Sequence, residues 1–426
     1  MKKLIVQNVG PIKNVELILK RINVIIGPQS AGKSCLLKLA CFCAWVEKRI
    51  QLEQGRNGFT DYDYWLSQLV AFHKLQGFFN DKSRIEYVTS EMQFSFDFGS
   101  RTFDLHWNHG HWKYERSRIS YIPAERNIVA VIPNWFEVNM GMNNIRSFIS
   151  DWNLSRKMCD NEEHLPILDL GVRYYYDKET GNDKVELANG ERLDFANASS
   201  GLQSAIPMLV YLDFLFNKQY TSKVLSNINT DSENEEILGK LYEAKFRGKL
   251  QKLKGRTEQP YIGKIGYGKL FFASEADYKE CKALYEAYTS THRSDIYLEE
   301  PEQNLFPLTQ IELVYELLKN MSVHNDSLFV ATHSPYILYA LNNCMLGYKA
   351  SKNIPADDVD MRKHSQSWIN PKEVSVWELR DGNLSSDIDQ KYRTIQDEDG
   401  LVRGNYFDRI MKSVMTDFSN YSSYYE

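Results

Sequence analysis

The sequence lacks the features of a secreted or membrane-embedded protein. No apolar run reaches the length of about eighteen residues that a membrane-spanning helix needs. The N-terminal segment Met-Lys-Lys-Leu-Ile-Val leads directly into a strand pattern and contains no signal-peptide cleavage site. The six cysteines form no C-x-x-C pair and no metal-binding spacing, so we expect reduced thiols without chemistry of their own. These absences favour a soluble protein of the cytoplasm that does not bind membranes.

Two further absences narrow the class of protein. The formal net charge of −5 provides no overall positive potential, which argues against a protein that binds nucleic acid through bulk charge. No heptad pattern runs past three repeats, so a long coiled-coil arm is excluded. Because 426 residues are too many for one compact core, we expect one large folded unit with insertions.

The most informative segment that is present is a G-x-x-x-x-G-K-S phosphate loop at residues 27–34, directly after the apolar run Ile22 to Ile26. A buried strand, a glycine loop and a following helix place backbone amides and a positive helix end around an anion. Lys33 would reach the β- and γ-phosphates, and the Ser34 hydroxyl is placed to bind Mg²⁺. The residues expected to bind the nucleotide here are Gly27, Gln29, Ser30, Ala31, Gly32, Lys33, Ser34 and Cys35. The competing interpretation is a chance glycine loop.

A second motif lies far downstream. The strand pattern Ser294 to Leu298 ends in Glu299-Glu300-Pro301-Glu302 and has the form of a Walker B segment, with carboxylates at the carboxyl end of a core strand. Glu299 stands where an aspartate usually holds the Mg²⁺ shell through water, and the glutamate adds a methylene. Glu300 is positioned to polarise the attacking water as general base.

Two more segments complete the set. The strand pattern Ser327 to Ala331 ends in Thr-His-Ser-Pro, where His333 can touch a γ-phosphate; the alternative is an ordinary loop histidine. The segment Asn197 to Ser204 opens an apolar helix that runs from Ala205 to Phe216. Its small residues offer a second helix N-terminus for close approach to phosphate.

In this order the four motifs resemble those of ABC-type ATPases, over most of the chain. Within that superfamily, four segments resemble the RecF/SMC/OLD branch rather than transporters: Asn8 to Ile12, Ile122 to Arg126, Glu299 to Pro307 and Ala331 to Pro335. The resemblance implies an α/β ABC-ATPase head, with a mixed sheet around a phosphate-loop core, an antiparallel β wing and a helical lobe. It also implies ATP and Mg²⁺ as cofactors, and hydrolysis at a composite interface of a homo-oligomer that is at least a dimer.

The resemblance assigns roles to the serine-rich helix start. In the implied head-to-tail sandwich, Ser199 and Gly201 of one copy contact the γ-phosphate held by the phosphate loop of another. The usual signature is Ser-Gly-Gly-Gln; here Ser200 replaces the first glycine as a nucleotide-binding residue, and Gln203 falls beside the glutamine of the signature.

The family's glutamine before the helical lobe is absent from the best match, Ser120 to Asn127. Either Arg126 or Glu125 serves instead, or the segment is a packed loop.

The motifs divide the chain into four parts. Residues 1–130 are expected to form the N-terminal part of the ATP-binding lobe with the antiparallel wing, which we place at Arg84 to Ile122. Residues 131–216 form the helical and signature lobe, 217–293 an insertion before Walker B, and 294–426 the C-terminal part of the ATP-binding lobe.

The insertion contains six cations in twelve residues without an acid. It is interpreted either as a solvated helical hairpin or as a contact for DNA or a partner protein. The cations are Lys245, Arg247, Lys249, Lys252, Lys254 and Arg256.

Three other clusters have weaker interpretations. The histidines His106, His109 and His111 form either a metal site or, more simply, a polar strand edge. The acids at 357, 358 and 360 follow the His motif where OLD-type nucleases carry a TOPRIM domain, but the remaining chain is too short for one, so a fused nuclease is not expected. Apolar residues at helical spacing near the C-terminus predict a helix with one apolar face. We interpret this face first as part of the protein core and second as a docking surface for a partner. Its members are Phe407, Ile410, Met411, Val414 and Phe418.

A nucleotide switch without nuclease, membrane or coiled-coil output is expected to act through a separate protein. Compact ATPases of this branch pair with nucleases in defence systems, and the chain resembles the ATPase subunits of PARIS (AriA) and Septu (PtuA). The resemblance implies a nuclease or TOPRIM-type effector and a phage-encoded trigger as partners. The alternatives are a RecF-like repair ATPase that clamps duplex DNA, and a transporter motor.

Overall fold

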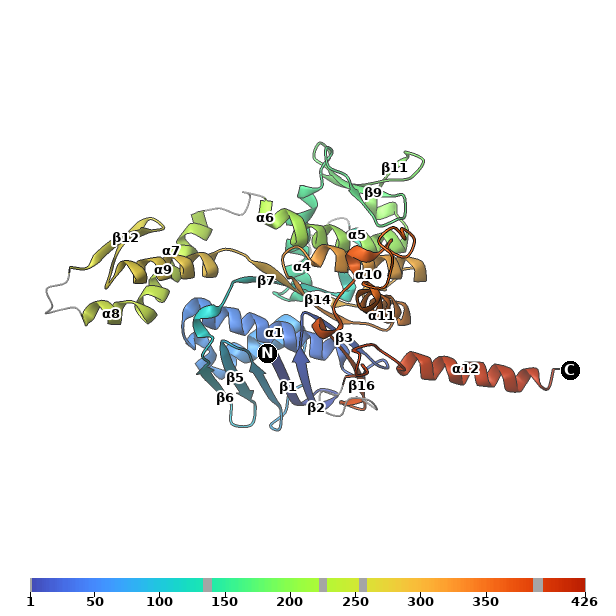
Figure 1. Cartoon of the computed structure of the whole chain (residues 1–426), viewed down its shortest axis with the longest axis horizontal. Coiled ribbons are helices and arrows are strands. Elements are labelled where there is room, and N and C mark those ends of the chain that lie inside the picture. The colour runs from blue at the N-terminus through green and yellow to red at the C-terminus, as the bar shows by residue number, and fades with distance from the viewer. Residues whose placement is uncertain (1, 133–139, 222–227, 253–258, 386–393, 426) are drawn as a thin grey trace.

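The computed structural model describes residues 2–132, 140–221, 228–252, 259–385 and 394–425. An eleven-stranded sheet runs through its centre in the order β6-β5-β4-β1-β2-β17-β16-β3-β15-β14-β7 (Figure 1). Its strands are β1 (Lys2–Val9), β2 (Ile12–Leu19), β3 (Ile22–Ile26), β4 (Arg84–Val88), β5 (Met92–Asp97), β6 (Thr102–Trp107), β7 (Ser117–Ile122), β14 (Arg293–Glu299), β15 (Ser327–Ala331), β16 (Val374–Arg380) and β17 (Asn383–Ser385). This mixed sheet with covering helices confirms the expected α/β class.

One half of the sheet is parallel. Strands β16, β3, β15, β14 and β7 are neighbours and run in one direction. Every residue of β3 is buried, as expected for a strand that is covered on both faces. The carboxyl ends of these five strands therefore meet at one edge of the sheet, which is where ligands bind in open α/β sheets.

The other half is the antiparallel wing, in which β1, β2, β4, β5 and β6 pair. The wing follows the expected alternation, since buried and half-buried residues alternate along β5. The predicted range was too long, however. Its last segment, β7, pairs in parallel with β14 at the far edge of the sheet, so it belongs to the nucleotide-binding half.

Each face of the sheet has its own hydrophobic core. Ile25 points toward α1 (Lys33–Glu53) and the wing, whereas Val24 and Ile26 point toward the opposite helices. The helices and small strands on this opposite face of the sheet are α3 (Ile128–Val131), α4 (Asn144–Ser155), β8 (Leu165–Pro166), β9 (Arg173–Asp177), β10 (Asn182–Glu186), β11 (Arg192–Asp194), α5 (Ser200–Asp213), α6 (Gln219–Thr221), α10 (Pro307–Met321) and α11 (Pro335–Ala350). On the wing side, α2 (Tyr62–His73) packs beside α1.

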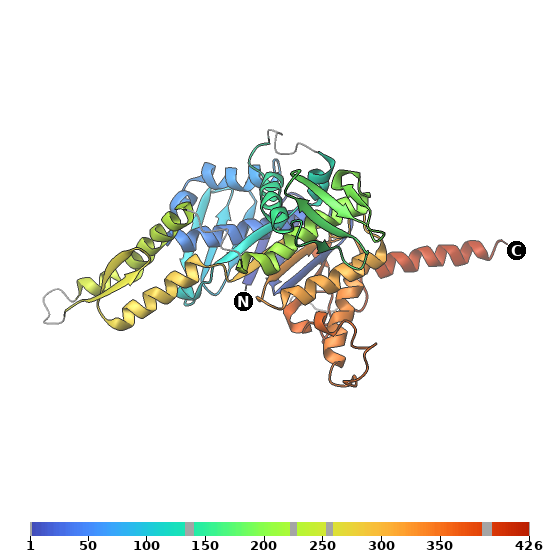
Figure 2. The same cartoon turned by 90° about the horizontal axis from the view of Figure 1, so that it is seen from above.

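The insertion extends from the body as a separate lobe, at the left of Figures 1 and 2. It consists of α7 (Ile228–Lys245), α8 (Arg247–Gln251), β12 (Tyr261–Ile265), β13 (Gly268–Phe272) and α9 (Glu275–Thr289). A small core of its own includes Leu241, Phe272 and Tyr288, and this core joins the end of α1 at Leu52.

The C-terminal helix α12 (Tyr406–Ser422) corrects the prediction of core packing. The helix projects away from the body (Figures 1 and 2), and Met411 and Phe418 are 63% and 67% exposed. Its base is held by a capping box at Asn405, by hydrogen bonds from the Tyr339 hydroxyl to Asp408 (2.5 Å) and from Arg409 to Glu378 on β16, and by Phe407, the one member of the apolar face in the described residues that packs against the main core. No helix in the described ranges is both long and apolar enough to cross a membrane.

Candidate functional site

The phosphate loop follows β3 and has backbone geometry that requires its glycines. Gly27 has φ 148° and Gly32 has φ 105°, both in the region that side chains disfavour. A Cβ at Gly27 would lie 2.3 Å from the carbonyl oxygen of Leu379, so the close approach of β16 excludes any side chain there. Helix α1 begins at Lys33, which places its N-terminal amides at the loop.

Lys33 is buried within this loop. Its Nζ donates to the carbonyl oxygens of Gly27 (2.9 Å) and Pro28 (2.8 Å), and the side chain is 4% exposed. Burial lowers the pKa of Lys33 to about 8, against the opposing effect of the Glu300 and Glu302 carboxylates. An anion bound in the loop would favour the charged ammonium and so offset the loss of hydration that burial causes.

The other loop residues divide by exposure. Gln29 and Ser30 are exposed at the tip, and Ala31 and Cys35 are buried beneath it. Burial raises the pKa of Cys35 to about 12, so its thiol stays neutral and its backbone amide is the group available to a phosphate.

Glu299, the last residue of β14, lies against the start of α1. The side chain is 5% exposed, and burial raises its pKa, while Lys38 and a hydrogen bond with Ser34 act in the opposite direction. The structure therefore brings together Ser34 and Glu299, the two residues predicted for Mg²⁺. Hydroxyl and carboxylate oxygens suit this ion, which usually takes one or two protein ligands beside phosphate oxygens and water.

Glu300 and His333 face each other at the ends of β14 and β15. His333 Nε2 lies 3.6 Å from Glu300 Oε1, and both side chains are about one-third exposed. Burial and the nearby Lys33 lower the pKa of His333, against the effect of Glu300, so a neutral imidazole is expected at pH 7. Glu300 itself has φ 41°, an uncommon conformation for a residue with a side chain, directly after the last residue of β14.

Glu302 was not assigned a role from the sequence, yet it holds the histidine segment. Its two carboxylate oxygens accept from the Thr332 hydroxyl (2.8 Å) and from the His333 backbone N–H (2.5 Å). Burial raises the pKa of this carboxyl, although these hydrogen bonds favour its ionised form. The signal in the sequence was the third carboxylate of Glu-Glu-Pro-Glu, beside a strand-end histidine.

The signature segment lies next to the Walker B turn. Ser199 caps helix α5, where its hydroxyl accepts from Leu202 N (3.4 Å), and both Ser199 and Ser200 are exposed. A Cβ at Gly201 would lie 3.0 Å from the carbonyl oxygen of Asn304. The N-terminus of α5, with both serines, is therefore exposed on the surface, where a second molecule could reach it.

For Arg126, the structure favours the packed-loop interpretation. The side chain is fully buried and donates to backbone carbonyls, so it is not presented to a nucleotide. Glu125 is exposed, with its carboxylate 3.9 Å from Lys74 Nζ, and it is near enough to contribute to the pKa of Glu299.

Among the described residues no group of three His, Cys, Asp or Glu side chains is arranged to hold a metal ion. His111 stacks between Trp107 and Trp112, with centroid distances of 3.6 and 4.2 Å, and its Nε2 lies 3.1 Å from Gln54 Oε1. Burial lowers its pKa to about 4.

Three of the four cations of the insertion that lie in the described residues pair with acids of the same lobe, whereas Lys252 is exposed. Lys245 pairs with Glu280 (2.7 Å) and Lys249 pairs with Asp277 (2.6 Å), both on α9. Arg247, at the start of α8, pairs with Glu243 on α7 at 2.5 Å. Lys254 and Arg256 lie outside the described residues.

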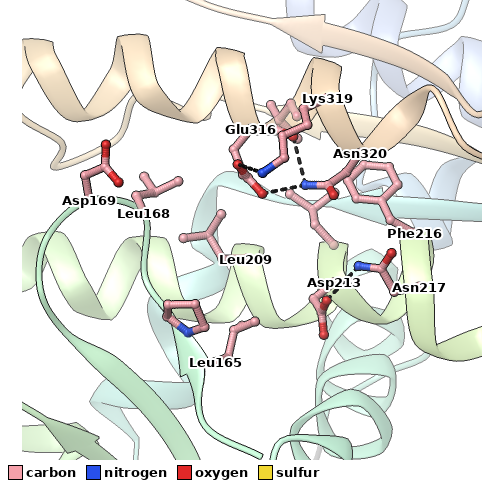
Figure 3. Close-up of a pocket in the computed structure, with 13 residues that line it drawn as sticks. Leu165, Leu168, Asp169, Leu209, Asp213, Phe216, Asn217, Glu316, Lys319 and Asn320 are labelled. Atoms are coloured by element: carbon pink, nitrogen blue, oxygen red, sulfur yellow. Dashed lines mark hydrogen bonds and ion pairs between the residues drawn. The ribbon is translucent and has the colours of Figure 1, made fainter. Parts of the chain in front are cut away.

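A cavity of about 340 Å³ lies away from the phosphate loop, between α5, α10 and the segment around β8 (Figure 3). Its polar groups are largely bonded to each other: Lys319 pairs with Glu316 (3.2 Å), and Asn217 donates to Asp213 (2.8 Å). The converging motif residues, and not this cavity, therefore define the candidate site.

Several solved structures are similar to this chain at low identity. The SMC head domain from Thermotoga maritima is 10% identical, with 79% of this chain and 90% of that chain covered and a TM-score of 0.34. The recombination mediator RecF with bound nucleotide is 10% identical (90% and 96% covered, TM-score 0.30), and a nucleotide-free ATP-binding cassette from an ABC transporter is 11% identical (90% and 90%, TM-score 0.25). No protein-family model and no curated protein matches the chain. At these identities the similarity concerns the fold alone.

Proposed function

We propose that this chain binds ATP with Mg²⁺ at the phosphate loop and hydrolyses it in a head-to-tail pair of copies. The observation that carries the proposal is the convergence of Lys33, Glu299, Glu300 and His333 at the carboxyl edge of β3, β14 and β15. The phosphate loop lies more than 260 residues before the other two motifs in the sequence, yet all three meet there with a cation, a metal-type carboxylate and a base.

Each side chain has a distinct role in this proposal. Lys33 binds the β- and γ-phosphate oxygens, and the Mg²⁺ ion, when bound near Ser34 and Glu299, neutralises charge on the same oxygens. Glu300 takes the proton of the attacking water, and the neutral His333 hydrogen-bonds the γ-phosphate. Ser199 of the second copy completes the site, because it is exposed at the N-terminus of α5, where a helix favours an anion.

Two substitutions test this assignment. Lys33→Ala should abolish ATP binding, whereas Glu300→Gln should keep binding and slow hydrolysis by about a hundredfold or more, the usual contribution of a general base. Equilibrium nucleotide binding and phosphate release measure the two effects. Unchanged turnover in Glu300→Gln would remove Glu300 as the base, and unchanged ATP affinity in Lys33→Ala would remove the phosphate loop as the site.

We further propose that the ATP state controls a separate nuclease-type effector in antiviral defence, with a phage product as trigger. The alternative is a RecF-like clamp on duplex DNA; the ion pairs of Lys245, Arg247 and Lys249 count against a DNA contact at these three positions, because such a contact needs free positive charge. Binding of duplex DNA that strengthens with ATP and weakens steeply with salt would establish the clamp instead. Toxicity that requires both this chain and a co-encoded nuclease would establish the defence role.

A further inference from the structure

Arg126 lies between the Walker B turn, which carries Glu300, and helix α5, which begins with the signature serines. Its guanidinium is fully buried and donates to the carbonyl oxygens of Glu299 (3.0 Å) and Glu300 (2.8 Å) in the Walker B turn. The same group donates to the carbonyl oxygens of Ser204 on α5 (3.1 Å) and Pro123 at the end of β7 (3.3 Å). A single planar side chain with five N–H donors thus connects three separate segments.

A second contact joins the same two elements. The Asn304 amide, in the turn after Walker B, donates to the Ser204 hydroxyl (2.9 Å). Ser204 is itself buried, and it accepts from Arg126 through its carbonyl and from Asn304 through its side chain. The first turns of α5 are therefore fixed to the turn that carries Glu300.

The bonds between Arg126 and the Walker B turn matter because the backbone of Glu300 in that turn is strained. Glu300 is held at φ 41°, which costs free energy and persists only where neighbouring contacts enforce it. Arg126 bonds the carbonyl of Glu300 itself, and the Glu300 N–H bonds the carbonyl of Ala331 (2.9 Å). A small displacement of α5 would act through Arg126 on the backbone that aims the base.

We propose that Arg126, assisted by Asn304, is a positioning residue that couples the two ATP sites of the pair. It transmits closure of α5 on the partner's nucleotide to Glu300 of its own copy, so that one filled site aligns the base of the other. This inference rests on the proposed head-to-tail pair.

The test uses mixed pairs purified through two different tags. The reporting copy keeps Lys33 and Glu300, while the other copy carries either Glu300→Gln, which binds ATP without turnover, or Lys33→Ala, which leaves its site empty. The ratio of turnover in these two pairs measures the effect of filling the second site. We expect a ratio of about five or more with an otherwise unmodified reporting copy.

Arg126→Lys in the reporting copy should reduce this ratio to about one, because one ammonium cannot reach carbonyls on three segments. The matched control is Arg118→Lys, which removes a half-buried guanidinium from β7 that bonds Asp151 on α4 and not the Walker B turn. This control should keep the ratio. A ratio in Arg126→Lys equal to that of the unmodified copy, or a ratio of one in the unmodified pair, would overturn the proposal.

Two further measurements distinguish a failure of the coupling from a failure of the proposed ATPase function and from misfolding of the variant. If unmodified pairs neither bind nor hydrolyse ATP, the proposed function fails and not only the coupling. If Arg126→Lys does not fold, as judged by thermal unfolding, Asn304→Gly carries the test, since Asn304 is exposed at φ 58° and glycine tolerates that conformation. Asn304→Gly should lower the ratio at unchanged ATP affinity, and an unaltered ratio would refute the coupling.

Discussion

The pKa of Lys33 leads to a prediction about the pH dependence of ATP binding. Burial lowers this pKa to about 8 in the free protein, whereas a bound triphosphate should raise it again because it favours the charged form. Binding then takes up a proton above pH 8, so ATP affinity falls as pH rises. With a free-state pKa near 8, about one molecule in eleven is protonated at pH 9, and the Kd should be about tenfold higher than at pH 7.

The measurement is the Kd for ATP with saturating Mg²⁺ from about pH 7 to pH 9.5, by calorimetry or fluorescence. Lys48 provides a matched control, because burial also lowers its pKa to about 8 while its Nζ bonds the Ser117 carbonyl on β7. Lys48→Met should keep the pH dependence and Lys33→Met should lose it together with most of the affinity. A Kd that stays constant up to pH 9.5 in the unmodified protein would refute the reasoning.

Three other substitutions test separate contacts. Gly27→Ala should lower the free energy of unfolding by about 1–3 kcal/mol in denaturant titration, since its Cβ meets the Leu379 carbonyl, whereas Gly239→Ala, in an open helical position, should raise it slightly. Glu302→Gln should reduce kcat about tenfold or more with the ATP Kd retained, because one of its two acceptor oxygens becomes a donor facing the histidine segment; an unchanged kcat would exclude that positioning role. Ser199→Arg should stop hydrolysis at nearly normal ATP affinity, and normal turnover in phosphate-release assays would argue against a shared site.

The parts of the site that could be predicted from sequence are those fixed by local geometry. The phosphate loop needs glycines at set positions between a strand and a helix, so the residue types at 27–34 are enough to predict its conformation. Glu299, Glu300 and His333 end core strands, and parallel strands bring such ends to one edge.

Arg126 and Glu302 show what the sequence did not reveal. The bonds of Arg126 reach residues 78 and 173 positions away, and those of Glu302 reach the end of another strand. A buried arginine that satisfies backbone carbonyls has no local pattern, because its acceptors are present in every residue of the chain. Its role depends entirely on where the tertiary structure brings those carbonyls.

The insertion and α12 show the limit of reading charge and periodicity along one segment. A run of cations predicts free positive potential only if no acids fold onto it, and here the acids on α9 follow about thirty residues later and neutralise Lys245 and Lys249. The apolar stripe of α12 correctly indicates a helix, yet periodicity states only that one face avoids water and not that the same chain covers it. In both cases the local pattern determines the element, and the opposing surface, which the pattern does not encode, determines what the element does.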